Sequence, residues 1–152
     1  MLVLLNRSLK FFVVIMLSLC MISISYAEAG RAEKMSILDI DADGNVDAPT
    51  DGLLILRSMF GLTDGALTTG LVASDAASIG SVDIESRITM LGDLADIDGN
   101  GNIDALTDGL LTLRYLFGRE GNTLVAGVVA ADATRTTAVD IEAHLKALML
   151  AL

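Results

Sequence analysis

The chain has 152 residues, with 20 acidic and 10 basic side chains and a formal net charge of −10. This length suffices for one domain or for two small modules. The acidic excess argues against nucleic acid or an anionic membrane as a partner and favours cations.

Residues 1–27 are predicted to form a secretory signal peptide. Arg7 and Lys10 precede the apolar run from Phe11 to Ile24, and Ser25-Tyr26-Ala27 follows as a small-x-small cleavage pattern. We therefore expect a secreted or periplasmic protein, and we exclude this segment from the fold.

Two alternatives remain for this segment. It could be retained as a membrane anchor, although its apolar run is slightly short for a span. Lipid attachment at Cys20 is less favoured, because Leu19 stands where a small residue is expected. Cleavage after Ala27 would leave 125 residues, with eight basic side chains against all twenty acidic ones, a net charge of −12. It would also remove the only cysteine, so this small exported domain could not be stabilised by an internal disulfide. Bound metal is one alternative source of stability.

The remainder, 28–152, is predicted to be one domain of two repeats. Residues 39–91 align with 96–148 at an offset of 57 without a gap, and sixteen of the first twenty-three aligned positions are identical. A period of this size indicates supersecondary units that bury their apolar faces against each other. Each unit reads as an acidic loop, a helix, a connector and a second helix, so we expect an all-α fold.

The first loop, DIDADGNVDAPTD, carries carboxylates at alternate positions, with Gly44 at its sharp turn. Calcium takes about six to eight oxygen ligands, and EF-hand loops supply them from alternate residues. An ordinary loop closes with a glutamate at its twelfth position, but Thr50 stands there, and we expect the next residue to close the site. The predicted ligands are Asp39, Asp41, Asp43, the Asn45 carbonyl, Asp47 (often through water) and Asp51.

The second loop, DIDGNGNIDALTD, repeats this pattern with an asparagine at its fifth position. Its predicted ligands are Asp96, Asp98, Asn100, the Asn102 carbonyl, Asp104 and Asp108. Val46 and Ile103, at the eighth positions, are expected to join the two loops by a short backbone contact. The alternative is a pair of acidic, solvated turns, but carboxylates this crowded repel one another without a cation. We therefore predict two calcium ions.

A helix is predicted after each loop. Thr50 and Thr107 are good N-cap types, and the aspartate after each would lie in the first turn, where the helix dipole favours negative charge. The runs LLILRSMF and LLTLRYLF continue the helix as far as Gly61 and Gly118, each in the place of a C′ glycine.

The connectors, 62–80 and 119–136, are small and polar, with room for a turn of their own. Apolar residues then recur at helical spacing and predict the second helix of each repeat. In the second repeat, Thr137 and Asp140 resemble a capping box. The apolar stripes are Ile84, Ile88 and Leu91 in one repeat, and Ile141, Leu145, Leu148 and Leu152 in the other.

Residues 39–61 and 96–118 resemble dockerin-type calcium repeats, which also pair one D-x-[DN]-x-[DN]-G loop with one following helix. The resemblance implies that two repeats pack with pseudo-twofold symmetry, fold on calcium and dock onto a cohesin partner, often in secreted polysaccharide-degrading systems. It also implies metal roles for the loop aspartates and Asn100. At the loop ends, where dockerins often carry small hydroxyl residues that touch cohesin, this chain has Ala48-Pro49 and Ala105-Leu106. The resemblance therefore assigns no cohesin-binding residues here.

Arg57 and Arg114 interrupt the leucine stripes at matching places. Each could snorkel, with its stem covering apolar surface. Our sharper hypothesis pairs each with a connector carboxylate, Asp75 or Asp132. His144, the only histidine, is better explained as a boundary residue than as a ligand or a catalytic group.

The chain lacks the groups of a catalytic site, because most carboxylates are committed to the loops and no nucleophile–base pair is evident. We therefore expect no enzyme. One interpretation is a structural or adhesive assembly module that calcium holds folded, since extracellular calcium is permanently available. The alternative is an extracytoplasmic calcium buffer or sensor. We favour the module.

Overall fold

The computed structural model describes residues 36–77 and 80–150, and its regular structure within these ranges is helical, without a strand. The all-α prediction is confirmed. The predicted signal segment, 1–27, and Leu152 lie outside the described residues. Among the residues described, none of the helices is long and apolar enough to cross a membrane.

Corresponding elements of the two halves begin 57 residues apart, except for the short connector helices. Both connectors hold such a helix, of five residues in the first and four in the second, in keeping with the turn expected there. A 3-10 turn, η2 (Gly92–Ala95), joins the halves. The first half contains the π-helical turn η1 (Ala48–Gly52), α2 (Leu53–Met59), α3 (Asp64–Thr68) and α4 (Ser81–Leu91). The second contains the π-helical turn η3 (Ala105–Gly109), α5 (Leu110–Leu116), α6 (Asn122–Val125) and α7 (Ala138–Leu150).

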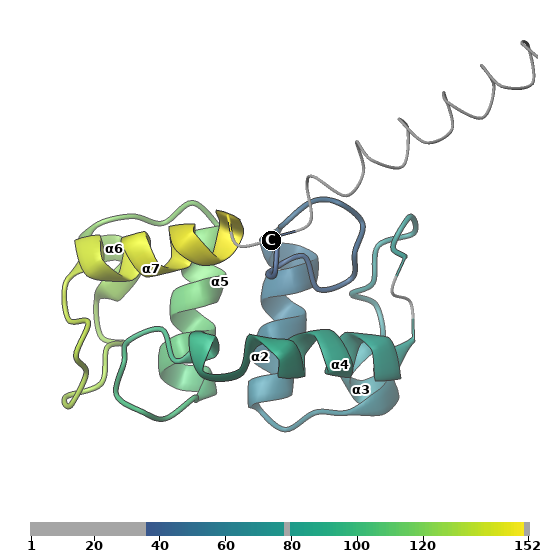
Figure 1. Ribbon diagram of the computed structural model, residues 1–152, viewed down its shortest axis with the longest axis horizontal. Coiled ribbons are helices and arrows are strands. Elements are labelled where there is room, and N and C mark those ends of the chain that lie inside the picture. The colour runs from purple at the N-terminus through teal and green to yellow at the C-terminus, as the bar shows by residue number, and fades with distance from the viewer. Residues whose placement is uncertain (1–35, 78–79, 151–152) are drawn as a thin grey trace, which may run out of the picture. The chain divides into compact units, whose positions relative to one another are not determined.

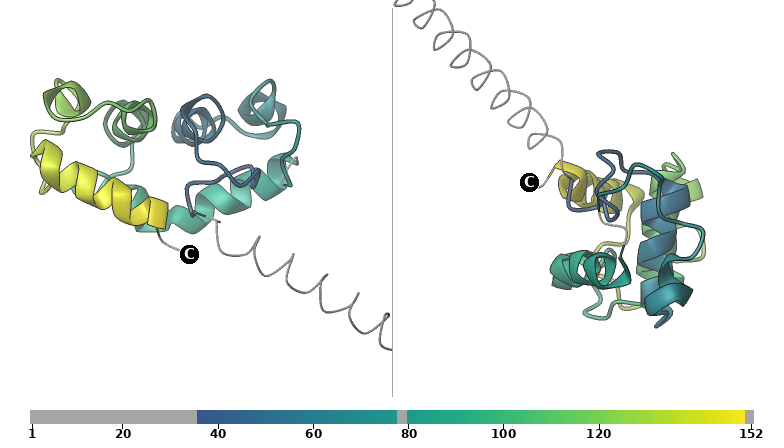
Figure 2. Two further views of the ribbon diagram at one scale, coloured as in Figure 1. Left: turned by 90° about the horizontal axis from the view of Figure 1, so that it is seen from above. Right: turned by 90° about the vertical axis from the view of Figure 1, so that its right-hand side faces the viewer.

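The helices form two layers (Figures 1 and 2). In one layer α2 and α5 lie side by side, with α3 next to α2 and α6 next to α5. In the other layer α4 lies against α2 and α3, and α7 lies against α5 and α6. Each half therefore packs a long second helix across its own pair of shorter helices.

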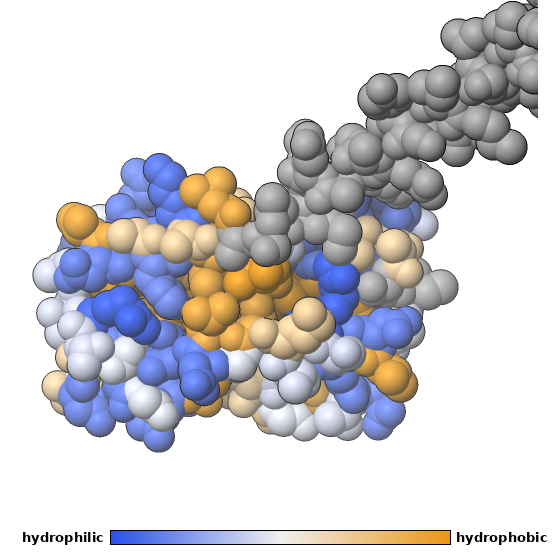
Figure 3. All heavy atoms as spheres, viewed as in Figure 1, coloured by the Kyte–Doolittle hydropathy of each residue, from blue (hydrophilic) through white to orange (hydrophobic). Residues whose placement is uncertain are grey.

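The buried faces of α4 and α7 follow the predicted stripes. The side chains of Ile84, Leu91, Ile141, Leu145 and Leu148 are buried, and Ile88 packs against them while partly exposed. Hydrophobic side chains also gather at the centre of the face on which α4 and α7 lie (Figure 3). The helical periodicity in the sequence thus identified the core side of both helices.

Glycines allow α2 and α5 to approach closely, and the contact is reciprocal. A Cβ atom on Gly52 would lie 2.9 Å from Leu113 Cδ1, and one on Gly109 would lie 2.7 Å from Leu56 Cδ1. Both glycines close a π-helical turn that directly follows an acidic loop. The end of each loop is therefore fixed by the first helix of the opposite half.

The helices α2 and α5 end as predicted. Gly61, with φ of +78°, donates its N–H to the Ser58 carbonyl, and the Leu62 N–H bonds to the Arg57 carbonyl. This pair of bonds is the Schellman motif, which a glycine at C′ favours. Gly118 makes the equivalent bond to Tyr115 at the end of α5.

Candidate metal centres

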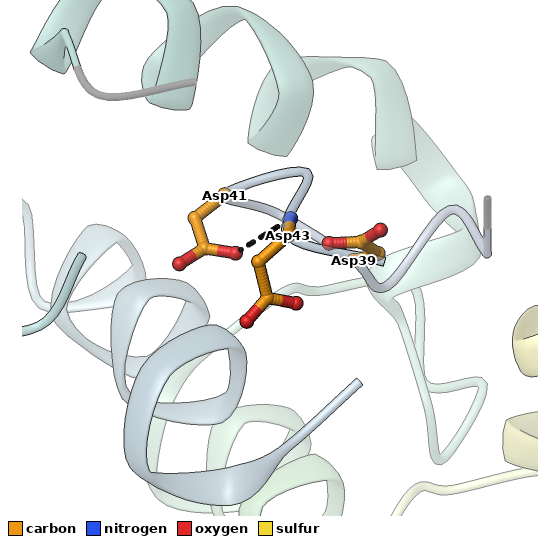
Figure 4. Close-up of side chains that lie close together, drawn as sticks. All are labelled: Asp39, Asp41 and Asp43. Atoms are coloured by element: carbon orange, nitrogen blue, oxygen red, sulfur yellow. Dashed lines mark hydrogen bonds between the residues drawn. The ribbon is translucent and has the colours of Figure 1, made fainter. Parts of the chain in front are cut away.

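The first candidate centre is formed by the first three aspartates of loop one. One carboxylate oxygen from each of Asp39, Asp41 and Asp43 lies within 4.8 Å of the other two. All three side chains come from a single turn of the chain (Figure 4). Asp39 and Asp41 are buried and Asp43 is half-buried, so the group is largely shielded from solvent. These three carboxylates could hold a metal ion.

Asp39 has an unsatisfied oxygen in this group. Its Oδ2 accepts a hydrogen bond from the Gly44 N–H at 3.1 Å. Its Oδ1 is buried and, within the described residues, has no hydrogen-bond partner. Burial raises the pKa of Asp39, while the Gly44 N–H and then the Arg87 guanidinium act to lower it. A buried oxygen without a partner costs free energy unless another group, such as a cation, satisfies it.

The second candidate centre lies in loop two. Oxygens of Asp96, Asp98 and Asp108 lie within 4.8 Å of one another. The fifth position holds Asn100, whose Oδ1 accepts from the Asn102 N–H at 2.8 Å, just as Asp43 Oδ1 accepts from the Asn45 N–H at 2.7 Å in loop one. The two loops thus have matching turns, with an amide in one where the other has a carboxylate.

The predicted closing residues, Asp51 and Asp108, are buried and bond to loop backbone with both oxygens. Asp51 accepts from the Ile40 N–H at 2.6 Å and from the Asp47 N–H at 2.8 Å, and Asp108 makes the equivalent bonds. Burial raises the pKa of Asp51 to about 7 and also raises that of Asp108. The structure includes Asp108 in its carboxylate group, whereas Asp51 lies outside the group of three in loop one. Each residue ties the two ends of its loop together, a role that we had not predicted.

Asp47 and Asp104 are N-caps of the helical segments. Asp47 Oδ1 accepts from the Thr50 N–H at 2.9 Å and from Thr50 Oγ1 at 2.6 Å. Asp104 Oδ1 accepts from the N–H groups of Leu106 and Thr107, both at 3.0 Å. The prediction that the threonines are the caps is therefore wrong, because each helical segment begins about one turn earlier. A water-mediated metal contact from these aspartates stays a prediction, as do contacts from the Asn45 and Asn102 carbonyls.

The first turn of each helical segment accommodates the extra loop residue. The Gly52 N–H bonds to the Asp47 carbonyl at 3.0 Å, and the Gly109 N–H bonds to the Asp104 carbonyl at 3.1 Å. Each bond spans five residues, which defines a π-helical turn, a feature that inserts one residue into a helix. The turn brings the thirteenth loop position to face the loop backbone.

Each connector returns to hold the loop of its own half. The Ala73 N–H donates to Asp41 Oδ2 and the Ala130 N–H donates to Asp98 Oδ2, both at 2.8 Å. The donors are backbone N–H groups, which every residue except proline carries, so the sequence could not show which residues make these contacts.

An arginine also braces each loop, from a different place in each half. Arg87 of α4 donates to the Asp39 carbonyl at 2.7 Å, whereas Arg135 of the second connector donates to the carbonyls of Ile97, at 2.7 Å, and Asp96. Comparison of matched repeat positions misses this pair, because the two arginines are not equivalent in the alignment.

Arg57 and Arg114 do not bond as our sharper hypothesis proposed. The Arg57 Nη1 group donates to the carbonyls of Leu67, at 3.0 Å, and Thr69, at 3.1 Å, at the end of α3. Arg114 makes equivalent bonds to carbonyls at the end of α6. Helix-end carbonyls lack intrahelical partners, which explains this preference. The predicted pairing with Asp75 or Asp132 is wrong.

The eighth loop residues pack across the molecule. Val46 lines a cavity of about 260 Å³ with Tyr115, Leu116 and Met149 of the second half. Ile103 lines one of about 360 Å³ with residues of the first half, including Ile55, Met59 and Ile88. Among the described residues no backbone hydrogen bond joins Val46 to Ile103, so the predicted contact between them is wrong.

His144 lies apart from both carboxylate groups, and its Nε2 is 2.9 Å from the Leu94 carbonyl oxygen.

No family model matches the chain, and comparisons with curated proteins and with solved structures give no match either. The candidate functional sites in the described residues are two groups of three carboxylates that could each hold a metal ion, one in each half of the helical fold.

Proposed function

We propose that the chain is a calcium-binding, dockerin-like module exported from the cytoplasm, in which two ions stabilise a helical fold used for protein–protein assembly or adhesion. The buried, unpartnered Oδ1 of Asp39, inside a group of three carboxylates, is the observation that carries this proposal. A cation in the group would give this oxygen a partner and offset the repulsion among the three charges.

The chemistry of the donors favours calcium over other common metals. Both groups offer oxygen atoms only, which suit hard cations rather than zinc or copper. Magnesium demands near-ideal octahedral geometry and keeps several waters, whereas calcium accepts irregular, flexible oxygen sites. One short turn that places carboxylates at alternate residues fits the calcium pattern. When bound, the ion would supply the positive charge that balances these carboxylates.

Reciprocal packing supports a paired arrangement of the loops. Gly52 lies against Leu113 of the second half, and Gly109 lies against Leu56 of the first, which is 57 residues earlier than Leu113. Such an exchange is expected for two repeats related by a pseudo-twofold axis. It supports the proposal that the two loops form one unit.

An exposed phenylalanine at the end of each central helix supports the assembly role. Phe60 follows α2 and is 56% exposed, and Phe117 follows α5 and is 59% exposed. Aromatic side chains are enriched where proteins contact each other, because they bury much area at small entropic cost. We propose that this pair contacts an extracellular protein partner, such as a cohesin-like domain in a polysaccharide-degrading system.

Calorimetric titration of residues 28–152 with calcium tests the metal assignment. We expect two ions per chain, with loop one binding no more weakly than loop two because it carries one more carboxylate. Asp39→Ala should remove the tighter site and Asp96→Ala the other, while Asp75→Ala in the exposed connector should leave both. A wild-type chain that takes up no calcium would contradict the proposal, as would unchanged stoichiometry in both loop variants.

A further inference from the structure

Loop two contains the sequence Asn100-Gly101, the one place where glycine follows asparagine among residues 28–152. An asparagine in this context is open to attack by the next backbone nitrogen, since glycine leaves that nitrogen unshielded. We propose that Asn100 is a site of spontaneous deamidation, and that the aspartate product gives loop two the carboxylate that Asp43 supplies in loop one.

The reaction needs water and no other reagent. The Gly101 backbone nitrogen bonds to Cγ of Asn100 and loses its proton, and the bond from Cγ to Nδ2 breaks, which releases ammonia. The resulting cyclic imide is then hydrolysed by one water molecule. Opening at one carbonyl gives an aspartate at position 100, and opening at the other gives isoaspartate.

The hydrogen bonds around Asn100 match the requirements of the first step. The Gly101 N–H donates to Asp96 Oδ2 at 2.9 Å, so a carboxylate is in place to accept the proton of the attacking nitrogen. The Asn100 Oδ1 atom, where negative charge develops, accepts from the Asn102 N–H at 2.8 Å. Its Nδ2 group lies 3.4 Å from Asp132 Oδ1, so the amide is held from both ends.

The two products would affect the loop in opposite ways. An aspartate at position 100 would make the first, third and fifth positions of loop two identical to those of loop one. Isoaspartate would lengthen the backbone by one atom and displace the residues that follow it.

A bound cation should slow the reaction, because it would engage the oxygens of Asp96 and Asn100. This protection rests on the proposed function, whereas the deamidation itself does not.

Peptide mass spectrometry of residues 28–152 after incubation at mildly alkaline pH, in EDTA or in calcium, tests the inference. We expect the mass gain of amide-to-acid conversion at Asn100, faster in EDTA, with Asn45, Asn102 and Asn122 as unconverted controls in the same sample. Equal conversion of Asn100 and Asn102 would overturn the inference.

A transplant of the site keeps the inference falsifiable if changes in loop two disturb folding. Asp43→Asn places an asparagine before Gly44, whose N–H donates to Asp39 Oδ2 at 3.1 Å, so the arrangement of loop two is reproduced. We expect the introduced amide to convert as Asn100 does, and an amide that stays intact would count against the mechanism. A rate at Asn100 that is equal in EDTA and calcium would support deamidation while contradicting the metal site.

Discussion

At the scale of single residues, Asp43 and Asp51 show two different uses of a loop carboxylate. Asp43 is half-buried and its Oδ1 accepts one backbone N–H, from Asn45 at 2.7 Å. Asp51 is fully buried and bonds through both oxygens to the backbone of Ile40 and Asp47. The first residue is available to a cation, whereas the second organises the loop itself.

Asparagine substitutions separate these roles. In Asp51→Asn the new amide has a single acceptor oxygen, so one buried N–H loses its partner, and we expect the free energy of unfolding in saturating calcium to fall by about 1–3 kcal/mol. Asp43→Asn keeps the acceptor for Asn45, so it should lower this free energy less, and only through weaker calcium binding. Urea unfolding in calcium measures the first effect and calorimetry the second. Equal loss of stability in the two variants would refute the organising role of Asp51.

Tyr115 offers a pH-dependent test that is independent of the loops. Burial, followed by the charges of Glu142 and Glu120, raises the pKa of Tyr115 above its ordinary value of 10.0. The folded state thus favours the neutral phenol, so this contribution to stability is present below pH 10 and is lost as the pH rises through the folded-state pKa.

The substitution Glu142→Gln should lower the pKa of Tyr115, as followed by the ultraviolet absorbance of the phenolate. Glutamine keeps an acceptor for the Gly121 N–H, which Glu142 now binds at 2.7 Å. Glu85→Gln is the matched control, because Glu85 makes the equivalent bond to the Asp64 N–H in the other half. The account of the Tyr115 shift would be wrong if both variants moved the titration equally.

At the scale of elements, the contact between α2 and α5 depends on glycine. Gly109→Ala would place a methyl group 2.7 Å from Leu56 Cδ1 and 3.0 Å from Met59 Sδ. These side-chain ends can shift in part, so we expect the free energy of unfolding to fall by about 1–3 kcal/mol. Gly65→Ala, at an exposed position of α3, meets only Thr69 Oγ1 at 3.8 Å and should be neutral or stabilising. Thermal unfolding of the two variants measures this difference. A Gly109→Ala protein more stable than Gly65→Ala would contradict the claim that the contact between α2 and α5 depends on glycine.

The link between α2 and α3 depends on Arg57, which bonds to the Leu67 and Thr69 carbonyls. We expect Arg57→Met to lower the free energy of unfolding by about 1–3 kcal/mol, because it removes charge-assisted hydrogen bonds. Asp75→Asn should have no effect if the carbonyls are the partners. Chemical denaturation of both variants measures these free energies. A destabilised Asp75→Asn protein would support an ion pair between Arg57 and Asp75 and contradict the bonding to carbonyls.

The elements also show what the sequence can and cannot predict. Core stripes and C′ glycines were predictable, because each depends on residues within a few positions of one another. The helix starts were misplaced, because a threonine resembles an N-cap in any sequence and the π-helical turn depends on the loop that precedes it. The partners of Arg57, Arg87 and Arg135 were missed, since they are backbone carbonyls that carry no mark in the sequence.

The candidate metal centres were predictable in part for the same reason. Alternate aspartates indicated both carboxylate groups, and the structure brings Asp39, Asp41 and Asp43 together in one and Asp96, Asp98 and Asp108 in the other. The bonds from the connectors to Asp41 and Asp98 span 32 residues and involve backbone N–H groups, so only the fold shows them.

At the scale of the whole molecule, the described helices share a modest core, and two groups of carboxylates, each with two buried members and one half-buried member, are formed by the loops. The single cysteine, Cys20, leaves no disulfide within one chain. In this account cations replace the missing crosslinks, because each loop is bonded to its own connector and its end packs against the opposite half. Binding of the ions should therefore be coupled to folding of the entire domain rather than of single loops.

Calcium titration of EDTA-treated residues 28–152, followed by far-ultraviolet circular dichroism, tests this claim most directly. We predict that EDTA abolishes most of the helical signal and that calcium restores it. Helices that persist unchanged in EDTA, with the same melting temperature as in calcium, would contradict the claim that the ions hold the fold together.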